Sequence, residues 1–218
     1  MDLGTPSHHS RVDCSPVDAL SCETIRARLR LRDCRAPPYV ELDRAAHQGS
    51  LRRAAVLLTL YRHAETWHLI FIRRAEHEGD RHSGEVGFPG GRWQRGDPSC
   101  VDTALREAEE EIALPRSQVD VLGELRPLRT VSEFLVTPVV GCISWPQTFR
   151  PEPREVARIF SIPLAWLGGP QHRQTLCYPA PGHPQARDLI FFDEFEGERL
   201  WGVSARITLD LITCLKSS

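Results

Sequence analysis

Three glutamates with a spacing suited to metal binding occur in the run Arg106-Glu-Ala-Glu-Glu-Glu-Ile-Ala-Leu114. On a helix, Glu107, Glu110 and Glu111 stand at positions i, i+3 and i+4 and project side by side, whereas Glu109 points elsewhere. Adjacent carboxylates late in a helix repel one another and are disfavoured by the helix dipole. A hard divalent cation would reverse this repulsion, and oxygen ligands suit Mg²⁺ or Mn²⁺. An acidic solvated helix face balanced by arginines explains the same pattern equally well.

A glycine-rich segment, Phe88-Pro-Gly-Gly91, lies just upstream of these glutamates. Gly90 and Gly91 would let the backbone approach a ligand closely and present amides to oxyanions. Segment and helix together could hold a diphosphate bridged by a cation. Taken alone, a Pro-Gly-Gly sequence usually forms a turn.

Together, residues 91–114 resemble the Nudix box, which is written G-x5-E-x7-R-E-U-x-E-E-x-G-U. The three box glutamates are intact, but the match departs from the pattern at three points. Asp97 stands at the first glutamate, the spacer to Arg106 is one residue longer, and Ala113 replaces the late glycine. Asp97 is expected to be the N-cap of the helix, with Pro98 at its first position.

A longer pattern resembles the coenzyme A pyrophosphatase branch of the Nudix hydrolases, which reads LLTxR[SA], then an arginine, then GxxxFPGG. Arg74-Ala75 and residues 84–91 follow it, whereas Ile70-Phe71-Ile72 replaces the LLT and Arg81 is the nearest internal arginine. Weaker similarity towards the C-terminus extends the resemblance over about residues 52–212.

The resemblance implies metal-dependent hydrolysis of coenzyme A or its derivatives to 3′,5′-ADP and (acyl-)4′-phosphopantetheine. It implies that Glu107, Glu110 and Glu111 bind Mg²⁺ or Mn²⁺, and that Glu110 also takes part in catalysis. Arg106 is expected to orient these glutamates through charge-assisted hydrogen bonds.

The general base is expected to be a box glutamate or a carboxylate from a later loop. Glu155 matches the family best and Glu133 is the second choice, although an ordinary surface glutamate would explain Glu155 equally well. His82, like the two arginines of the branch pattern, is a candidate contact to the 3′-phosphate of coenzyme A. The residues expected to bind substrate are Gly90, Gly91, Arg74 and Arg81.

Strands and helices alternate along the chain and must position these residues. The predicted strands are residues 54–61, 67–72, 119–125 and 135–143, and the predicted helices include residues 97–114 and 201–215. Residues 79–91 are expected to form a loop. The alternation indicates one mixed α/β domain, and the resemblance implies an α/β/α sandwich with a mixed sheet.

The N-terminal part of the chain is expected to be an extension. Residues 1–17 resemble a disordered polar tail, and residues 18–51 contain a helix that begins after Ser21 and ends before Pro37-Pro38. The arginine-rich face of this helix is expected to be solvated. The catalytic domain is expected at residues 52–215.

Composition excludes several classes of protein. The 218 residues include 27 Lys and Arg against 29 Asp and Glu, a net charge of -2 that does not favour nucleic acid as a partner. No apolar run reaches the length of a membrane helix, and the polar N-terminus does not resemble a signal peptide. Seven scattered cysteines favour reduced thiols and a cytoplasmic location. A homodimer is expected from the frequency of dimers among soluble proteins.

Two other functions compete with coenzyme A hydrolysis. Because the LLT positions of the branch pattern are altered, another Nudix substrate, such as ADP-ribose, a dinucleotide or an oxidised nucleotide, is an alternative. A non-catalytic nucleotide-binding module is the third hypothesis, and the intact glutamates count against it.

Overall fold

The structure is a computed structural model that describes residues 17–31, 51–77, 79, 83–178 and 187–216. Its elements, with η marking a 3₁₀ helix, are α1 (Cys22–Leu31), β1 (Arg52–His63), β2 (Thr66–Arg74), β3 (Val86–Gly87), β4 (Gly90–Arg92), α2 (Cys100–Ile112), η2 (Arg116–Gln118), β5 (Asp120–Glu124), β6 (Leu128–Arg129), β7 (Phe134–Cys142), β8 (Val156–Pro163), α3 (Leu164–Leu167), η3 (Pro170–His172), β9 (Arg173–Tyr178), β10 (Arg187–Phe195), β11 (Glu198–Trp201) and α4 (Gly202–Lys216). Among the described residues, no helix is long and apolar enough to cross a membrane.

The main sheet is mixed, as expected. Its strand order is β3-β2-β1-β7-β5, with β4 pairing with β1, β6 with β7, and β8 with β2. β1 runs parallel to β7 and antiparallel to β2 and β4. Ala64 and Glu65 turn the chain between β1 and β2 with φ values of 46° and 66°, the left-handed geometry that suits a tight hairpin.

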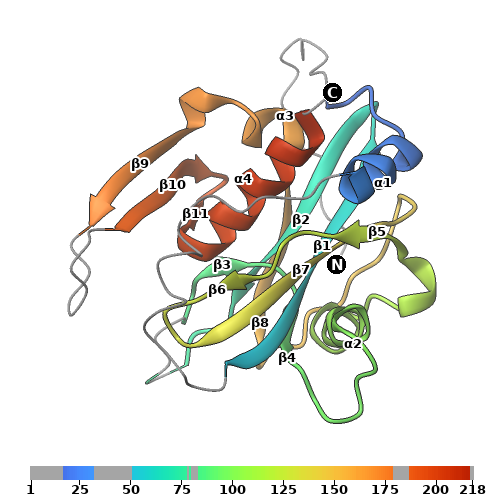
Figure 1. The fold of residues 1–218 in the computed structure, drawn as a ribbon, viewed down its shortest axis with the longest axis vertical. Coiled ribbons are helices and arrows are strands. Elements are labelled where there is room, and N and C mark those ends of the chain that lie inside the picture. Colours follow the sequence, from blue (N-terminus) through green and yellow to red (C-terminus); the bar gives the residue numbers. More distant parts are fainter. Residues whose placement is uncertain (1–16, 32–50, 78, 80–82, 179–186, 217–218) are drawn as a thin grey trace.

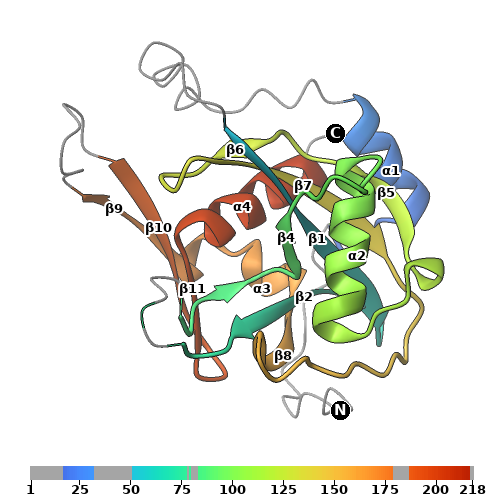
Figure 2. The same ribbon diagram turned by 90° about the horizontal axis from the view of Figure 1, so that it is seen from below.

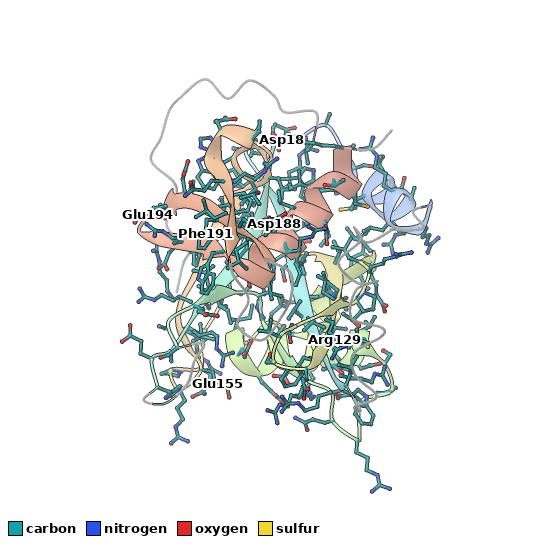
Figure 3. The ribbon with its side chains drawn as sticks, turned by 60° about the vertical axis from the view of Figure 1, so that its left-hand side comes forward. Asp18, Arg129, Glu155, Asp188, Phe191 and Glu194 are labelled. Atoms are coloured by element: carbon teal, nitrogen blue, oxygen red, sulfur yellow. The ribbon has the colours of Figure 1, made fainter. Side chains whose placement is uncertain are left out.

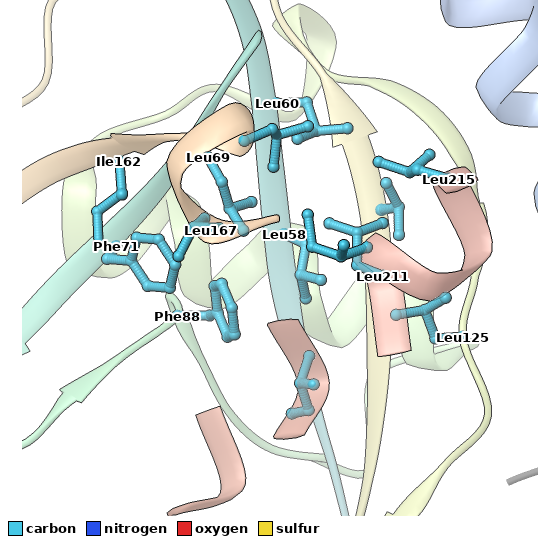
Figure 4. Packing of buried hydrophobic residues seen from close by; sticks show 14 of the residues in the cluster. Leu58, Leu60, Leu69, Phe71, Phe88, Leu125, Ile162, Leu167, Leu211 and Leu215 are labelled. Carbon is cyan, nitrogen blue, oxygen red and sulfur yellow. The ribbon is translucent and has the colours of Figure 1, made fainter. Parts of the chain in front are cut away.

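Two apolar cores lie on opposite faces of this sheet and make the fold a sandwich (Figures 1 and 2). Because side chains alternate along a strand, Leu57 of β1 packs on the α2 side, and Leu58 packs on the side of α1, α3 and α4. Leu58, Phe71 and Leu211 all belong to the core on the side of α1, α3 and α4, in which Phe71 lies beside Phe88 (Figure 4). The expected α/β/α architecture is therefore confirmed.

A second, three-stranded sheet in the order β11-β10-β9 lies beside the main sheet (Figure 1). None of the strands predicted from the sequence falls in this sheet. The sheet packs through Ile190, Phe192 and Leu200, which belong to the same core as α4. Its outer strands are short and largely polar, so periodicity alone gives little signal for them.

The N-terminal helix packs directly on the catalytic domain. α1 begins after Ser21, as expected, and Val17 and Ile25 are fully buried in the core that includes α4. The expectation that its arginines are simply solvated is wrong: Arg26 donates a 2.6 Å hydrogen bond to Asp120, and Arg28 donates to a main-chain carbonyl of α4. Residues 1–16 and 32–50, with Pro37-Pro38, lie outside the described residues, and the expected boundary at residue 52 stays a prediction.

Candidate active site

The acidic helix, α2, begins two residues later than expected, at Cys100 rather than Pro98. Ser99 is its N-cap, because the Ser99 hydroxyl accepts a 3.2 Å hydrogen bond from the Asp102 amide. The expected capping role of Asp97, with Pro98 as first helical residue, is therefore wrong. The Asp97 side chain turns instead towards Arg106, further along the helix.

Asp97 and Arg106 form a two-pronged ion pair. Arg106 Nε donates to Asp97 Oδ1 and Arg106 Nη2 to Asp97 Oδ2, each over 3.0 Å. Thr103 and the amide of Gln94 donate to the same carboxylate at 2.9 and 3.0 Å. Hydrogen bonding to Arg106 is the main cause that holds the pKa of Asp97 well below its usual range, so this carboxylate is a permanent anchor for the arginine.

The anchored arginine holds two box glutamates. Arg106 Nη1 lies 2.9 Å from both Glu107 Oε1 and Glu110 Oε2, and Nη2 donates to the Arg92 carbonyl of β4 at 3.1 Å. Arg106 therefore contacts two of the three predicted metal ligands, and its orienting role stays a prediction. The two glutamates differ in environment, since the Glu110 side chain is 57% exposed and that of Glu107 is 13% exposed.

Gly90 and Gly91 allow β4 to lie against both β1 and α2. A Cβ atom on Gly90 would come within 2.4 Å of the Ala55 carbonyl oxygen, and one on Gly91 within 2.6 Å of the Glu107 carboxylate. The Gly90 amide donates a 2.9 Å hydrogen bond to Glu111 Oε2. The residues predicted as a loop at 79–91 thus include strand β3 and the start of β4.

Glu111 is the most buried of the predicted metal ligands. It is 2% exposed, a burial that the i, i+3 and i+4 spacing of the three glutamates does not reveal. Burial, followed by the negative charges of Glu107 and Glu155, raises the pKa of Glu111 to about 8 against the opposing effects of the Gly90 amide and Arg74. Burial is also the main cause that raises the pKa of Glu107. Four predicted site residues therefore interact electrostatically: Glu107, Glu111, Glu155 and Arg74.

Glu155 reaches this group from a turn attached to the end of α2. The Glu152 amide donates to the Glu111 carbonyl at 2.8 Å, and the Ala75 amide donates to the Glu155 carbonyl at 2.9 Å. Figure 3 shows Glu155 at the end of the molecule where α2 lies. Glu133 lies instead in the turn before β7, on the side of β1 opposite to β2. Arg81 and His82 fall outside the described residues.

The carboxylates suit a hard cation without forming a finished ligand cage. Within the described ranges, no three His, Cys, Asp or Glu side chains are grouped closely enough to enclose a metal ion. Arg106 engages Glu107 and Glu110, and the Gly90 amide engages Glu111. The oxygen donors and the mutual repulsion of Glu107, Glu111 and Glu155 nevertheless fit a divalent cation, which would lower the free energy of the clustered charges.

Comparison with known proteins identifies the family. The family model described as NUDIX domain matches residues 51–178. The chain belongs to the Nudix family. The resemblance to the Nudix family and the enzyme class expected from it, a Nudix pyrophosphohydrolase, are thereby confirmed, whereas the resemblance to the coenzyme A branch stays a prediction. Nudix hydrolases generally use divalent metal ions.

Curated Nudix relatives align over most of their length. An "Uncharacterized Nudix hydrolase NudL" from Pectobacterium atrosepticum is 39% identical over 193 residues, covering 88% of this chain and 93% of the relative. A protein of the same name from Yersinia enterocolitica is 38% identical, covering 71% and 76%. The solved structure of a MutT/nudix family protein from Enterococcus faecalis has 14% identity and a TM-score of 0.48, covering 88% of this chain and 73% of that chain.

The departures from the Nudix box now have structural counterparts. Ala113, at the late glycine, is the C-cap of the Nudix helix and adopts the left-handed φ of 53° and ψ of 38° that glycine adopts most readily. Asp97, at the first glutamate, binds the box arginine. Sequence reasoning missed this pairing although the box position of Asp97 was a signal for it.

Proposed function

We propose that this Nudix enzyme hydrolyses the diphosphate of coenzyme A or its derivatives to 3′,5′-ADP and (acyl-)4′-phosphopantetheine. The observation that carries the proposal is the convergence of the branch pattern on one carboxylate. Gly90 of the FPGG segment donates its amide to Glu111, and the positive charge of Arg74 from the LLTxR[SA] segment opposes the rise in the pKa of the same carboxylate. Both distinguishing segments therefore border the acidic group.

Glu107, Glu110 and Glu111 are the proposed ligands of Mg²⁺ or Mn²⁺. When bound, such a cation neutralises diphosphate charge and activates water for attack on phosphorus. The network around Arg106 keeps Glu107 and Glu110 together, and Asp97 prevents the arginine from turning away. Arg106 thus acts in catalysis by orienting carboxylates.

The other site residues divide between binding and proton transfer. Arg74 and Arg81 bind substrate phosphate through their guanidinium groups, and Gly90 and Gly91 shape the backbone beside the diphosphate. Glu155 is the proposed general base, because it interacts with Glu107 and Glu111 from a separate turn. It would accept the proton that the attacking water loses.

A substrate panel tests this proposal. The purified chain is incubated with Mg²⁺ or Mn²⁺ and coenzyme A, ADP-ribose, a dinucleoside polyphosphate or an oxidised nucleotide, and the products are resolved by chromatography. Release of 3′,5′-ADP from coenzyme A much faster than AMP from ADP-ribose is the expected result. The reverse ranking would contradict coenzyme A specificity, and thermal stabilisation by coenzyme A without any turnover would favour a binding module. The cytoplasmic location and the homodimer stay predictions.

A further inference from the structure

A buried carboxylate of the second sheet, Glu198, contacts two arginines of the main sheet. Glu198 is 4% exposed, accepts a 3.0 Å hydrogen bond from Arg158 Nη1, and lies 3.6 Å from Arg73 Nη1. Arg158 of β8 and Arg73 of β2 stand directly opposite each other in the sheet. Because burying a carboxylate is unfavourable unless it is well paired, this contact differs from an incidental surface ion pair.

The two arginines lie where the pairing of β2 with β8 is irregular. Arg73 pairs with Arg158, but Arg74 pairs with Val156, so Ala157 has no opposite residue. A bulge of this kind changes the direction of the side chains on either side of it. Val156 packs in the core on the α2 side, whereas Arg158 binds Glu198 of the second sheet.

Beside this bulge, two neighbouring arginines of β2 point to opposite faces of the sheet, as successive residues of a strand do. Arg73 contacts Glu198, and the next residue, Arg74, interacts with Glu111 of α2. On the partner strand, Glu155 precedes the bulge, and its carbonyl accepts the Ala75 amide at 2.9 Å. The backbone that places Arg74 and Glu155 beside the acidic helix is therefore the backbone that Glu198 holds from the other face.

We propose that Glu198 is a positioning residue that fixes this bulge and thereby aims Arg74 and Glu155 at the reacting diphosphate. The inference rests on the proposed function for its catalytic consequence. It assigns the second sheet a part in the site, since β11 lies beside β3 and the end of β2 (Figure 1). The Glu198 carboxylate itself does not touch substrate.

Glu198→Gln tests the proposal with little risk to the fold. The amide preserves the shape of the side chain, and Arg158 keeps its hydrogen bonds to the Glu196 carbonyl and side chain at 2.9 and 3.2 Å. Glu194→Gln is the matched control, because Glu194 is an exposed carboxylate on β10 of the same sheet. Unfolding temperatures are measured for both variants.

The kinetic test is a double-mutant cycle with Arg74→Gln on coenzyme A and Mn²⁺. Glu198→Gln should lower kcat/KM by about 10-fold or more through misplacement of groups it does not touch, while Glu194→Gln leaves it unchanged. If Glu198 acts through Arg74, then Glu198→Gln should lower kcat/KM much less in the Arg74→Gln background than it does in wild type. Unchanged kcat/KM in Glu198→Gln would overturn the proposal, and fully multiplicative losses would overturn its assignment of Arg74 as a group that Glu198 aims.

Hydrogen exchange separates failure of this inference from failure of the proposed function. Exchange of the Ala75 amide, which bonds to the Glu155 carbonyl, should be faster in Glu198→Gln than in wild type and unchanged in Glu194→Gln. If no diphosphate substrate is hydrolysed by the wild type, the proposed function fails, yet this measurement still decides whether Glu198 holds the bulge. Equal exchange in Glu198→Gln and wild type would overturn the positioning role.

Discussion

Replacing Ala113 by glycine should stabilise this Nudix domain. Ala113 caps α2 with φ 53° and ψ 38°, and the amide of the next residue, Leu114, donates a 3.3 Å hydrogen bond to the Ala108 carbonyl. A left-handed conformation costs a residue with a Cβ atom about 1–2 kcal/mol. Glycine removes that strain, but it makes the unfolded chain more flexible, which offsets about 0.4–1 kcal/mol.

The net gain expected for Ala113→Gly is about 0.5–1 kcal/mol, the difference between these two effects. In a domain of this size it corresponds to an increase of about 1–4 °C in the unfolding temperature, measured by circular dichroism or calorimetry. Catalytic activity should be retained, because the three box glutamates and Arg106 are unchanged.

Ala165→Gly provides the matched control. Ala165 is half-buried like Ala113, but it lies inside helix α3 and does not have a positive φ. Glycine there should destabilise the protein by about 0.5–1 kcal/mol. The reasoning would be refuted if Ala113→Gly lowered the unfolding temperature as Ala165→Gly does.

Three further predictions concern a glycine beside Glu107, a buried histidine and a pair of cysteines. Gly91→Ala would bring a Cβ within 2.6 Å of the Glu107 carboxylate, so kcat/KM for coenzyme A should fall at least about 10-fold; unchanged kinetics would contradict this. Because burial lowers the pKa of His68 from 6.5 to about 4, its stabilising neutral form is fully present above pH 6.5 and is lost as the pH falls towards 4. Denaturant titrations should therefore show that, between pH 6.5 and pH 4, the free energy of unfolding falls by up to about 3 kcal/mol more in wild type than in His68→Phe. Equal decreases in the two proteins would refute this prediction. Oxidised glutathione should join Cys22 to Cys142, whose Sγ atoms are 3.0 Å apart, releasing two reduced glutathiones; peptide mass mapping that finds either cysteine paired elsewhere would contradict this.

The elements that carry a strong local pattern could be predicted from the sequence. The apolar runs at residues 54–61 and 67–72 correspond to β1 and β2, and the buried side of the acidic helix follows from Ala104, Ala108 and Ile112. These features depend on periodicity within a short stretch of chain, so neighbouring residues are sufficient to reveal them.

The remaining features depend on contacts between distant residues. Glu111 is buried because β4 lies against α2, where the Gly90 amide donates a hydrogen bond to the Glu111 carboxylate. A helical projection of α2 alone cannot show this contact. Asp97 is a favoured residue type for an N-cap and precedes a proline, but its carboxylate binds Arg106 instead of a helix amide, and Ser99 is the N-cap. The packing of Glu198 against Arg73 likewise joins strands that are far apart in the chain.

The central claim is that the carboxylates of α2 act on a diphosphate through a bound cation. The most direct test compares wild type with Glu110→Gln in the release of 3′,5′-ADP from coenzyme A with Mn²⁺. The Glu110 side chain is 57% exposed, so the substitution should leave the unfolding temperature nearly unchanged. We predict that Glu110→Gln lowers kcat by about 100-fold or more. Release near the wild-type rate by a folded Glu110→Gln would contradict the assignment of the acidic helix.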